Sequence, residues 1–285
     1  MRFALDPAML KARPVEAALQ AAAEAGYGFV ELGNRDDLIP AFDAVGVSPT
    51  DLRRTRLAAR QAGVEIVSVA VIQAWSSPDE DVRAQAVSWW QDGIAAVVAL
   101  GCTRINTELS GSPSRPDDCR AAFLRSVETL LPVLEREGIE IVVEPHPGDF
   151  IETTAGAVDL VRSIGSSRIR YLHCVPHTYY LGGTASDQIE YARGWFDHVH
   201  LADTYRPERT IVNPPALTNR VHQHFDIGRG ELDWAEIGRA LRLTAFDGTL
   251  TVQVFGWDEQ AEKSFVVDLA AVERLFGQTD GTGER

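Results

Sequence analysis

Short runs rich in β-branched residues alternate with longer amphipathic segments along the whole chain. The short runs have the length and composition of buried parallel strands. The sequence predicts eight of them: Arg2–Asp6, Gly28–Leu32, Glu65–Val71, Cys102–Glu108, Ile139–Glu144, Ile169–Cys174, Asp197–Ala202 and Thr249–Val254. The longer segments carry the spacing of amphipathic helices, predicted at Pro14–Ala25, Pro49–Ala62, Pro78–Leu100, Pro116–Glu137, Ala155–Ile164, Ser186–Arg193, Asp233–Leu243 and Asp258–Phe276.

Proline and glycine mark the ends of several predicted helices. Prolines stand near the first four helix starts, and glycines such as Gly63, Gly101 and Gly138 follow helices, which is their usual asymmetry. Eight strand–helix repeats predict an α/β fold with a single closed parallel barrel, the (β/α)8 TIM barrel. We expect this barrel over residues 1–276 and a polar C-terminal tail over 277–285. The longest irregular stretch, Asp203–Gly230, follows the seventh strand and is predicted to be functional.

Charge and composition exclude several classes of protein. The 285 residues carry 41 acidic and 27 basic side chains, a net charge of −14, which disfavours nucleic acid as a partner. Neither lysine, Lys11 or Lys263, follows a glycine, so a Walker-type phosphate loop is absent from the sequence. A Gly-x-Gly-x-x-Gly motif after a strand is also missing, so a nicotinamide dehydrogenase has no support.

The cellular setting is predicted from the same composition. The longest apolar run, Ile94–Leu100, is too short to span a membrane, and the N-terminus lacks the apolar stretch of a signal peptide. Three cysteines, odd in number and far apart, fit a reducing compartment. We therefore expect a cytoplasmic protein with no membrane partner.

Groups able to bind a metal gather at the predicted C-terminal ends of the strands, where barrels of this kind place their active sites. All seven histidines fall between positions 146 and 224. The candidates are Glu108, Glu144, His146, Cys174, His177, His200, His222, His224 and Gln253. Since divalent cations accept mixed carboxylate and imidazole ligands, Glu144 and His200 form the leading pair of metal ligands, with a structural carboxylate as the alternative for Glu144.

Other candidates keep two interpretations. His198 lies deeper than His200 and is favoured as a packed core histidine, and His173 is expected to face the helices. Cys174 is either a soft ligand or a small core residue. His224 and its neighbour His222 suit either substrate or metal binding. Trp75, after the third strand, either stacks on a sugar ring or anchors its loop.

The motifs at these positions resemble the xylose-isomerase-like barrel superfamily over the whole chain, and within it the IolH proteins of myo-inositol catabolism. They are Phe3-Ala4-Leu5-Asp6-Pro7, Val143-Glu144-Pro145-His146-Pro147, Pro176-His177-Thr178, His198-Val199-His200-Leu201-Ala202-Asp203-Thr204, Asn213-Pro214-Pro215 and Val221-His222-Gln223-His224-Phe225-Asp226-Ile227-Gly228. The resemblance implies a divalent metal (Mn, Co, Zn or Mg), a polyol or keto-sugar substrate, and a homodimer, since barrels of this superfamily commonly pair.

The resemblance also assigns site residues. The strand-five glutamate matches Glu144 and the strand-seven histidine matches His200, whereas the strand-six aspartate is Cys174 and the strand-eight glutamate is Gln253. His224 matches a histidine that binds additional metals in endonuclease IV. The implied metal ligands are thus Glu144, Cys174, His200, His224 and Gln253. The candidate substrate contacts are Trp75, Asn213 and His222. The replacements lower the expected charge of the ligand set from three carboxylates to one.

Gln253 also constrains the expected chemistry. Superfamily epimerases use the strand-five and strand-eight carboxylates as opposed bases, and an amide cannot accept that proton. One-base chemistry remains: a metal polarises an oxygen, Glu144 or Glu108 removes a carbon-bound proton, and His177 or His146 relays it. We expect an isomerase or epimerase acting through an enediolate. The alternatives are a dehydratase or lyase on a keto-inositol or keto-sugar, a non-catalytic accessory barrel, and a DNA-repair endonuclease, against which the negative charge counts.

Overall fold

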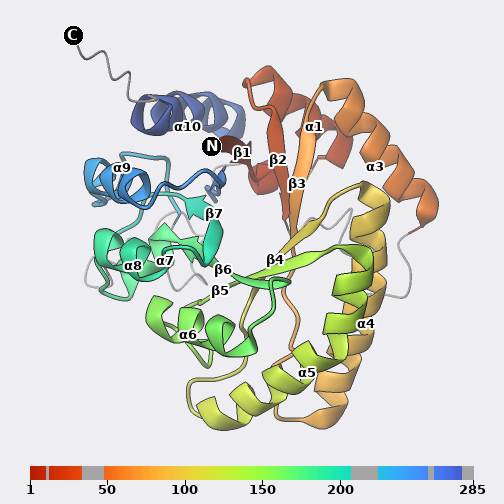
Figure 1. Ribbon diagram of the computed structural model, residues 1–285. Helices are drawn as coiled ribbons and strands as arrows, with labels where there is room; N and C mark the ends of the chain where they lie inside the picture. Colours follow the sequence, from red (N-terminus) through yellow and green to blue (C-terminus); the bar gives the residue numbers. More distant parts are fainter. Residues whose placement is uncertain (11–12, 34–47, 207–223, 256–259, 278–285) are drawn as a thin grey trace.

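The protein is described by a computed structural model that covers residues 1–10, 13–33, 48–206, 224–255 and 260–277 (Figure 1). Within these residues eight parallel strands form a barrel that closes through pairing of the first strand with the last. The strands are β1 (Arg2–Leu5), β2 (Phe29–Gly33), β3 (Glu65–Ala70), β4 (Arg104–Glu108), β5 (Glu140–Glu144), β6 (Ile169–Cys174), β7 (Phe196–Leu201) and β8 (Thr249–Val252). The predicted single TIM barrel is confirmed.

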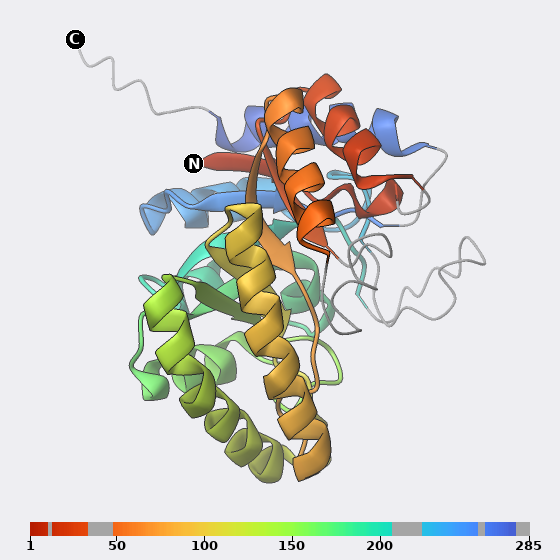
Figure 2. The ribbon, with the colours of Figure 1, turned by 90° about the vertical axis from the view of Figure 1, so that its right-hand side faces the viewer.

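Helices surround the strands and cover the outer face of the barrel (Figures 1 and 2). They are η1 (Pro7–Leu10), α1 (Val15–Glu24), α3 (Pro49–Ala62), α4 (Glu80–Leu100), α5 (Pro116–Glu137), α6 (Thr154–Ile164), α7 (Val175–Tyr180), α8 (Ala185–Tyr191), α9 (Trp234–Leu243) and α10 (Ala261–Phe276). All eight predicted helices are present. Helices η1 and α7 were not predicted, because turns of four and six residues carry too little periodicity to stand out.

Local chemistry sets the helix boundaries. Helix α4 begins at Glu80 and not at Pro78, because the Asp79 side chain accepts hydrogen bonds from the backbone N–H groups of Asp81 and Val82. Helices α4 and α5 end at Gly101 and Gly138, whose φ angles of 82° and 70° are left-handed. The glycine stops predicted from the sequence therefore hold at these positions.

Two cores of different character flank the sheet. Between the strands and the helices, large apolar side chains such as Trp90, Phe123 and Phe265 are fully buried. Inside the barrel, a small apolar cluster of Val142, Leu172 and Cys174 faces polar and charged side chains from β2, β4 and β7. Charged side chains buried inside the barrel indicate a function besides packing. The candidate site lies in the barrel at the C-terminal ends of the strands.

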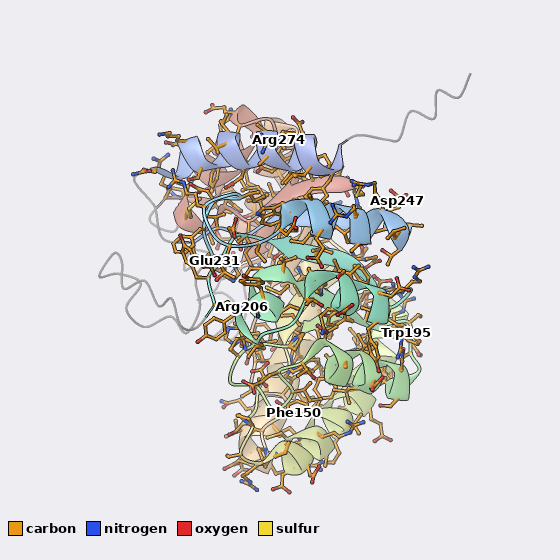
Figure 3. All side chains as sticks on the ribbon, turned by 90° about the vertical axis from the view of Figure 1, so that its left-hand side faces the viewer. Phe150, Trp195, Arg206, Glu231, Asp247 and Arg274 are labelled. Carbon is orange, nitrogen blue, oxygen red and sulfur yellow. The ribbon has the colours of Figure 1, made fainter. Side chains whose placement is uncertain are left out.

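The two ends of the barrel are distinguished in Figure 3. Arg206 and Glu231, which follow β7, lie on one side of the molecule, and Trp195 and Asp247, which precede β7 and β8, lie on the other. The first side is the C-terminal end of the strands. The last helix ends at Phe276, and residues 278–285 of the predicted tail lie outside the described residues. Within the described part of the chain, every helix is too short or too polar to cross a membrane.

Candidate active site at the barrel mouth

The strand ends bring most of the predicted residues together. Glu108, Glu144 and Cys174 are the last residues of β4, β5 and β6, and His200 lies one residue before the end of β7. The register pairs Glu108 with Glu144 across β4 and β5, and Cys174 with His200 across β6 and β7. The parallel arrangement therefore places these side chains at one end of the barrel.

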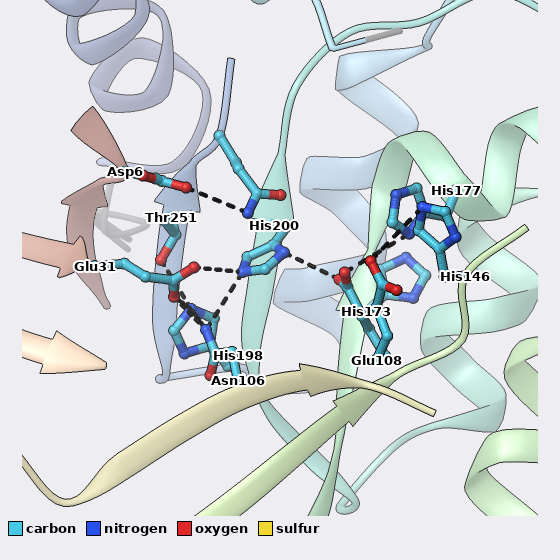
Figure 4. Close-up of polar contacts among 12 residues, drawn as sticks. Asp6, Glu31, Asn106, Glu108, His146, His173, His177, His198, His200 and Thr251 are labelled. Carbon is cyan, nitrogen blue, oxygen red and sulfur yellow. Dashed lines mark hydrogen bonds and ion pairs between the residues drawn. The ribbon is translucent and has the colours of Figure 1, made fainter. Parts of the chain in front are cut away.

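His200 is the centre of this cluster. Its Nδ1 lies 3.0 Å from Oε2 of Glu144, and its Nε2 lies 3.0 Å from Oε1 of Glu31 on β2 (Figure 4). Burial opposes protonation of the ring, but the carboxylates of Glu31 and Glu144 raise the pKa of His200 well above its usual value. Without a metal, His200 is thus a buried cation between two anions.

Glu31, which lies 169 positions before His200 in the chain, was not among the predicted site residues. Glu31 is fully buried and also contacts His198 at 3.1 Å, Ser68 at 2.6 Å and Asn106. Although burial would raise the pKa of this carboxyl, His200 and His198 hold it well below its usual value. The sequence signal that could have identified Glu31 is a single charged residue between Val30 and Leu32 in a predicted strand.

A second missed carboxyl lies beside Gln253. Oδ2 of Asp6, directly after β1, is 3.4 Å from Nε2 of Gln253, and Oδ1 accepts the N–H of Ala8 at 2.9 Å. Burial, together with Glu31, raises the pKa of Asp6 to about 7. Asp6 and Glu31 are thus acidic groups beside the proposed ligand positions, in addition to the one carboxylate expected in the ligand set.

Cys174, His177 and His224 form a neighbouring buried group, whose possible ligand atoms lie within 4.8 Å of one another. Nδ1 of His224 donates to the carbonyl of Gln253 at 2.8 Å, and Nδ1 of His177 lies 3.9 Å from Oε1 of Glu144. Burial raises the pKa of the Cys174 thiol to about 12. Helix α7, which begins directly after Cys174, carries His177 into this group.

Glu108, His146 and Asp149 form a third group at the rim. Nε2 of His146 lies 3.8 Å from Oε1 of Glu108. Burial, then the charges of Glu144 and Asp149, raise the pKa of Glu108 to about 9, and burial lowers the pKa of His146. A carboxyl with this pKa holds its proton at neutral pH, which favours Glu108 as a proton donor and leaves Glu144 as the preferred base of the two.

The remaining histidines of β6 and β7 are packed in the interior, as the sequence predicts. His198 is fully buried and its Nε2 lies 2.8 Å from Oγ1 of Thr251. His173 is also fully buried, and its Nδ1 lies 3.0 Å from the hydroxyl of Tyr171. Burial lowers the pKa of His173 to about 3, which keeps the ring neutral.

Of the three predicted substrate contacts, the structure describes only Trp75. Trp75 is fully buried against Trp90 and Phe123, with ring centroids 5.2 and 4.7 Å apart, and its Nε1–H donates to the carbonyl of Glu108. No face of this ring is open to a sugar. Trp75 therefore anchors its loop, and the sugar-stacking interpretation is wrong. Asn213 and His222 lie outside the described residues.

The ligand atoms fit a divalent metal. Two ligands each about 2.1 Å from an ion lie roughly 3.0–3.4 Å apart, and Nδ1 of His200 and Oε2 of Glu144 have that spacing. One ligand atom from each of Glu144, Cys174 and His200 lies within 4.8 Å of the others. A thiol, an imidazole and one carboxylate form a softer donor set than carboxylates alone, which favours zinc or cobalt over magnesium.

Comparison with known proteins assigns the family. The Xylose isomerase-like TIM barrel family matches residues 19–267, and the chain belongs to this family. A curated relative, D-psicose 3-epimerase from Enterocloster bolteae, is 27% identical over 139 residues, which are 48% of this chain and 40% of that protein. The matching region thus spans less than half of the relative.

Solved structures share the fold over nearly the whole chain. A D-psicose 3-epimerase crystallised in the presence of D-fructose has a TM-score of 0.79 at 17% identity, covering 98% of this chain and 100% of that one. The IolI protein, solved with a bound zinc atom, has a TM-score of 0.79 at 15% identity, covering 96% and 98%. At such identities the similarity is one of fold.

Proposed function

We propose that this protein is a divalent-metal-dependent isomerase or epimerase that acts on a polyol-derived keto-sugar through an enediol. The observation that carries the proposal is the contact of Glu144 with His200 beside a protonated Glu108 at the barrel mouth. The epimerase relative and the zinc-containing IolI structure support the class of reaction and the metal. A ketose or an inositol-derived ketone is the proposed substrate.

Glu144, His200 and Cys174 would hold the metal, with His177, His224 and Gln253 beside them. When bound, a divalent metal polarises a carbonyl or hydroxyl oxygen of the substrate and so acidifies the neighbouring C–H. This ligand set would release protons on loading, because the Cys174 thiol and His200 both carry protons in the metal-free protein.

Two carboxyl groups on neighbouring strands divide the proton transfers. The Glu144 carboxylate removes the proton from carbon, and Glu108 donates its proton to a developing substrate oxygen. After these transfers Glu144 holds a proton and Glu108 lacks one. His146 passes the proton between these two carboxyls, and its ring contacts that of His177 at a centroid distance of 4.6 Å. Different surroundings thus give two carboxyls opposite roles.

A dehydratase is the second candidate, because a protonated Glu108 is also the group that a leaving hydroxyl requires. The metal and Glu144 would serve both reactions. The two differ in product: isomerisation conserves mass, whereas dehydration loses one water. The reaction must therefore be identified from the product and not from turnover alone.

The test is proton exchange at carbon. Protein loaded with Zn²⁺, Co²⁺ or Mn²⁺ is incubated in D₂O with ketoses and inositol-derived ketones, and products are followed by NMR and mass spectrometry. We expect deuterium at the carbon beside the carbonyl, and its loss in Glu144→Gln. Glu140→Gln, on the same strand at the opposite end of the barrel, is the matched control. No exchange by the loaded wild type across this panel would contradict the proposal.

A further inference from the structure

The two ring nitrogens of His200 face different surroundings. Nδ1 points to Glu144, which is 8% exposed and lies at the mouth, whereas Nε2 points to Glu31, which is 0% exposed. Figure 4 shows Glu31 and Glu108 on opposite sides of the His200 ring. Nδ1 therefore faces the candidate site, and Nε2 faces the closed interior of the barrel.

We infer that Glu31 is a positioning residue that holds the Nε2 proton of His200 and thereby presents Nδ1 to the metal. The inference rests on the proposed function, since it assumes a metal at the mouth. A metal-binding histidine usually donates its second N–H to a carboxylate or carbonyl, which fixes the tautomer and makes the ligating nitrogen more basic.

Glu31 is itself held in place at its other oxygen. Three groups from β3, β4 and β7 converge on Oε2: the Ser68 hydroxyl at 2.6 Å, Nε2 of His198 at 3.1 Å, and the Asn106 amide. These contacts fix the rotation of the carboxylate and leave Oε1 directed at His200. The ring of His200 is thus anchored from behind by a preorganised acceptor.

A metal between Glu31, His198 and His200 is the competing arrangement, because their possible ligand atoms also lie within 4.8 Å of one another. However, Glu31 and His198 are 0% exposed whereas Glu144 is 8% exposed, so an ion on the Glu144 side of His200 lies nearer the mouth of the barrel. The geometry favours Nδ1 as the ligating atom.

The substitution Glu31→Gln tests this arrangement by changing one atom. Three donors face Oε2, so the glutamine amide is best satisfied with its carbonyl toward them and its NH₂ toward His200. Nε2 of His200 must then accept a hydrogen bond, so Nε2 loses its proton and the one remaining ring proton stays on Nδ1. Nδ1–H would donate to Glu144, and both leading ligands would be blocked.

The first measurement is the affinity for Zn²⁺, by competition with a chelator, in Glu31→Gln and in the matched control Glu140→Gln. We expect a loss of about 10- to 100-fold in Glu31→Gln, the usual effect of losing such a partner, and wild-type affinity in the control. Equal affinities in folded wild type and Glu31→Gln would overturn the inference.

The second measurement uses the wild type and does not depend on folding of the variant. Two-bond ¹H–¹⁵N correlation of the zinc-loaded protein, with His200 assigned by substitution, reports which nitrogen holds the proton. A proton on Nε2 and zinc on Nδ1 support the inference, and the reverse pattern overturns it. A wild type that binds no zinc would instead contradict the proposed function, so the two failures are distinguishable.

Discussion

Carboxyl groups only a few residues from a strand end have opposite protonation states here because their surroundings differ. Glu31 is surrounded by hydrogen-bond donors and a cationic histidine, so its carboxylate stays ionised despite complete burial. Glu108 faces Glu144 and Asp149 in a buried setting and keeps its proton to about pH 9. Burial alone therefore does not decide the role of an acid; the charges and donors around it do.

Glu108→Gln tests the acid role. A proton donor with a pKa of about 9 is active while protonated, so kcat should fall as the pH rises through 9. The variant should lose about 10²- to 10⁴-fold in kcat and also lose this alkaline limb. The measurement is the pH profile of kcat, with Glu137→Gln at the end of α5 as the control. A wild-type profile in Glu108→Gln would remove Glu108 from the reaction.

Gln253→Glu restores the carboxylate that the family resemblance leads one to expect. The new charge would lie about as close to Asp6 as the present 3.4 Å contact, so the metal-free variant should lose roughly 2 kcal/mol of stability above pH 7. Mn²⁺ should recover that loss, since a hard cation prefers carboxylate ligands, and should bind more tightly than to wild type.

Thermal unfolding with and without Mn²⁺, plus the Mn²⁺ dissociation constant, provides the measurement. Gln91→Glu, on the exposed side of α4, controls for added charge. Unchanged stability and unchanged affinity would indicate that position 253 lies outside the ligand shell.

At the scale of elements, the loop between β3 and α4 is held by Trp75, which packs between α4 and α5. Trp75→Phe removes the hydrogen bond to the Glu108 carbonyl and leaves a gap, so stability should fall by about 1–3 kcal/mol. Because the ring does not reach the mouth, KM for the substrate should stay unchanged. A large rise in KM at unchanged stability, measured by steady-state kinetics and urea unfolding, would restore the sugar-stacking role.

The alternation of strands and helices was predictable because buried parallel strands and amphipathic helices have different periods. The ends of β4 to β7 were therefore placed well enough to bring Glu108, Glu144 and His200 together. The contact between Glu31 and His200 could not be predicted, because it crosses the barrel and depends on which side chains point inward. Helix α7 could not be predicted because six residues carry too little periodicity, although Pro176 lies in the first turn of this helix.

At the scale of the molecule, the last helix is tied to the chain before α9 by a buried acid. Oδ1 of Asp268 on α10 accepts the N–H of Ile227 at 2.8 Å. Burial raises the pKa of Asp268 to about 8, with a further contribution from Asp226. This acid binds its proton more tightly when folded, so its stabilising contribution is complete below about pH 4 and is lost as the pH rises through 8.

Asp268→Asn should therefore flatten the dependence of stability on pH. An amide retains an oxygen for the Ile227 N–H but never ionises, so the variant should gain about 1–3 kcal/mol over wild type at pH 8 and little at pH 5. Urea unfolding at pH 5, 6.5 and 8 measures this difference. Parallel curves for the two proteins would show that Asp268 does not titrate in this range.

The proposed function requires a divalent metal at the barrel mouth between Glu144 and His200. Anomalous diffraction at the zinc, cobalt and manganese absorption edges, from crystals of the purified protein soaked with each ion, tests it most directly. We expect a peak about 2.0–2.2 Å from Nδ1 of His200 and from a Glu144 oxygen. A mouth without an anomalous peak after all three soaks, or a peak only on the Glu31 side of His200, would contradict it.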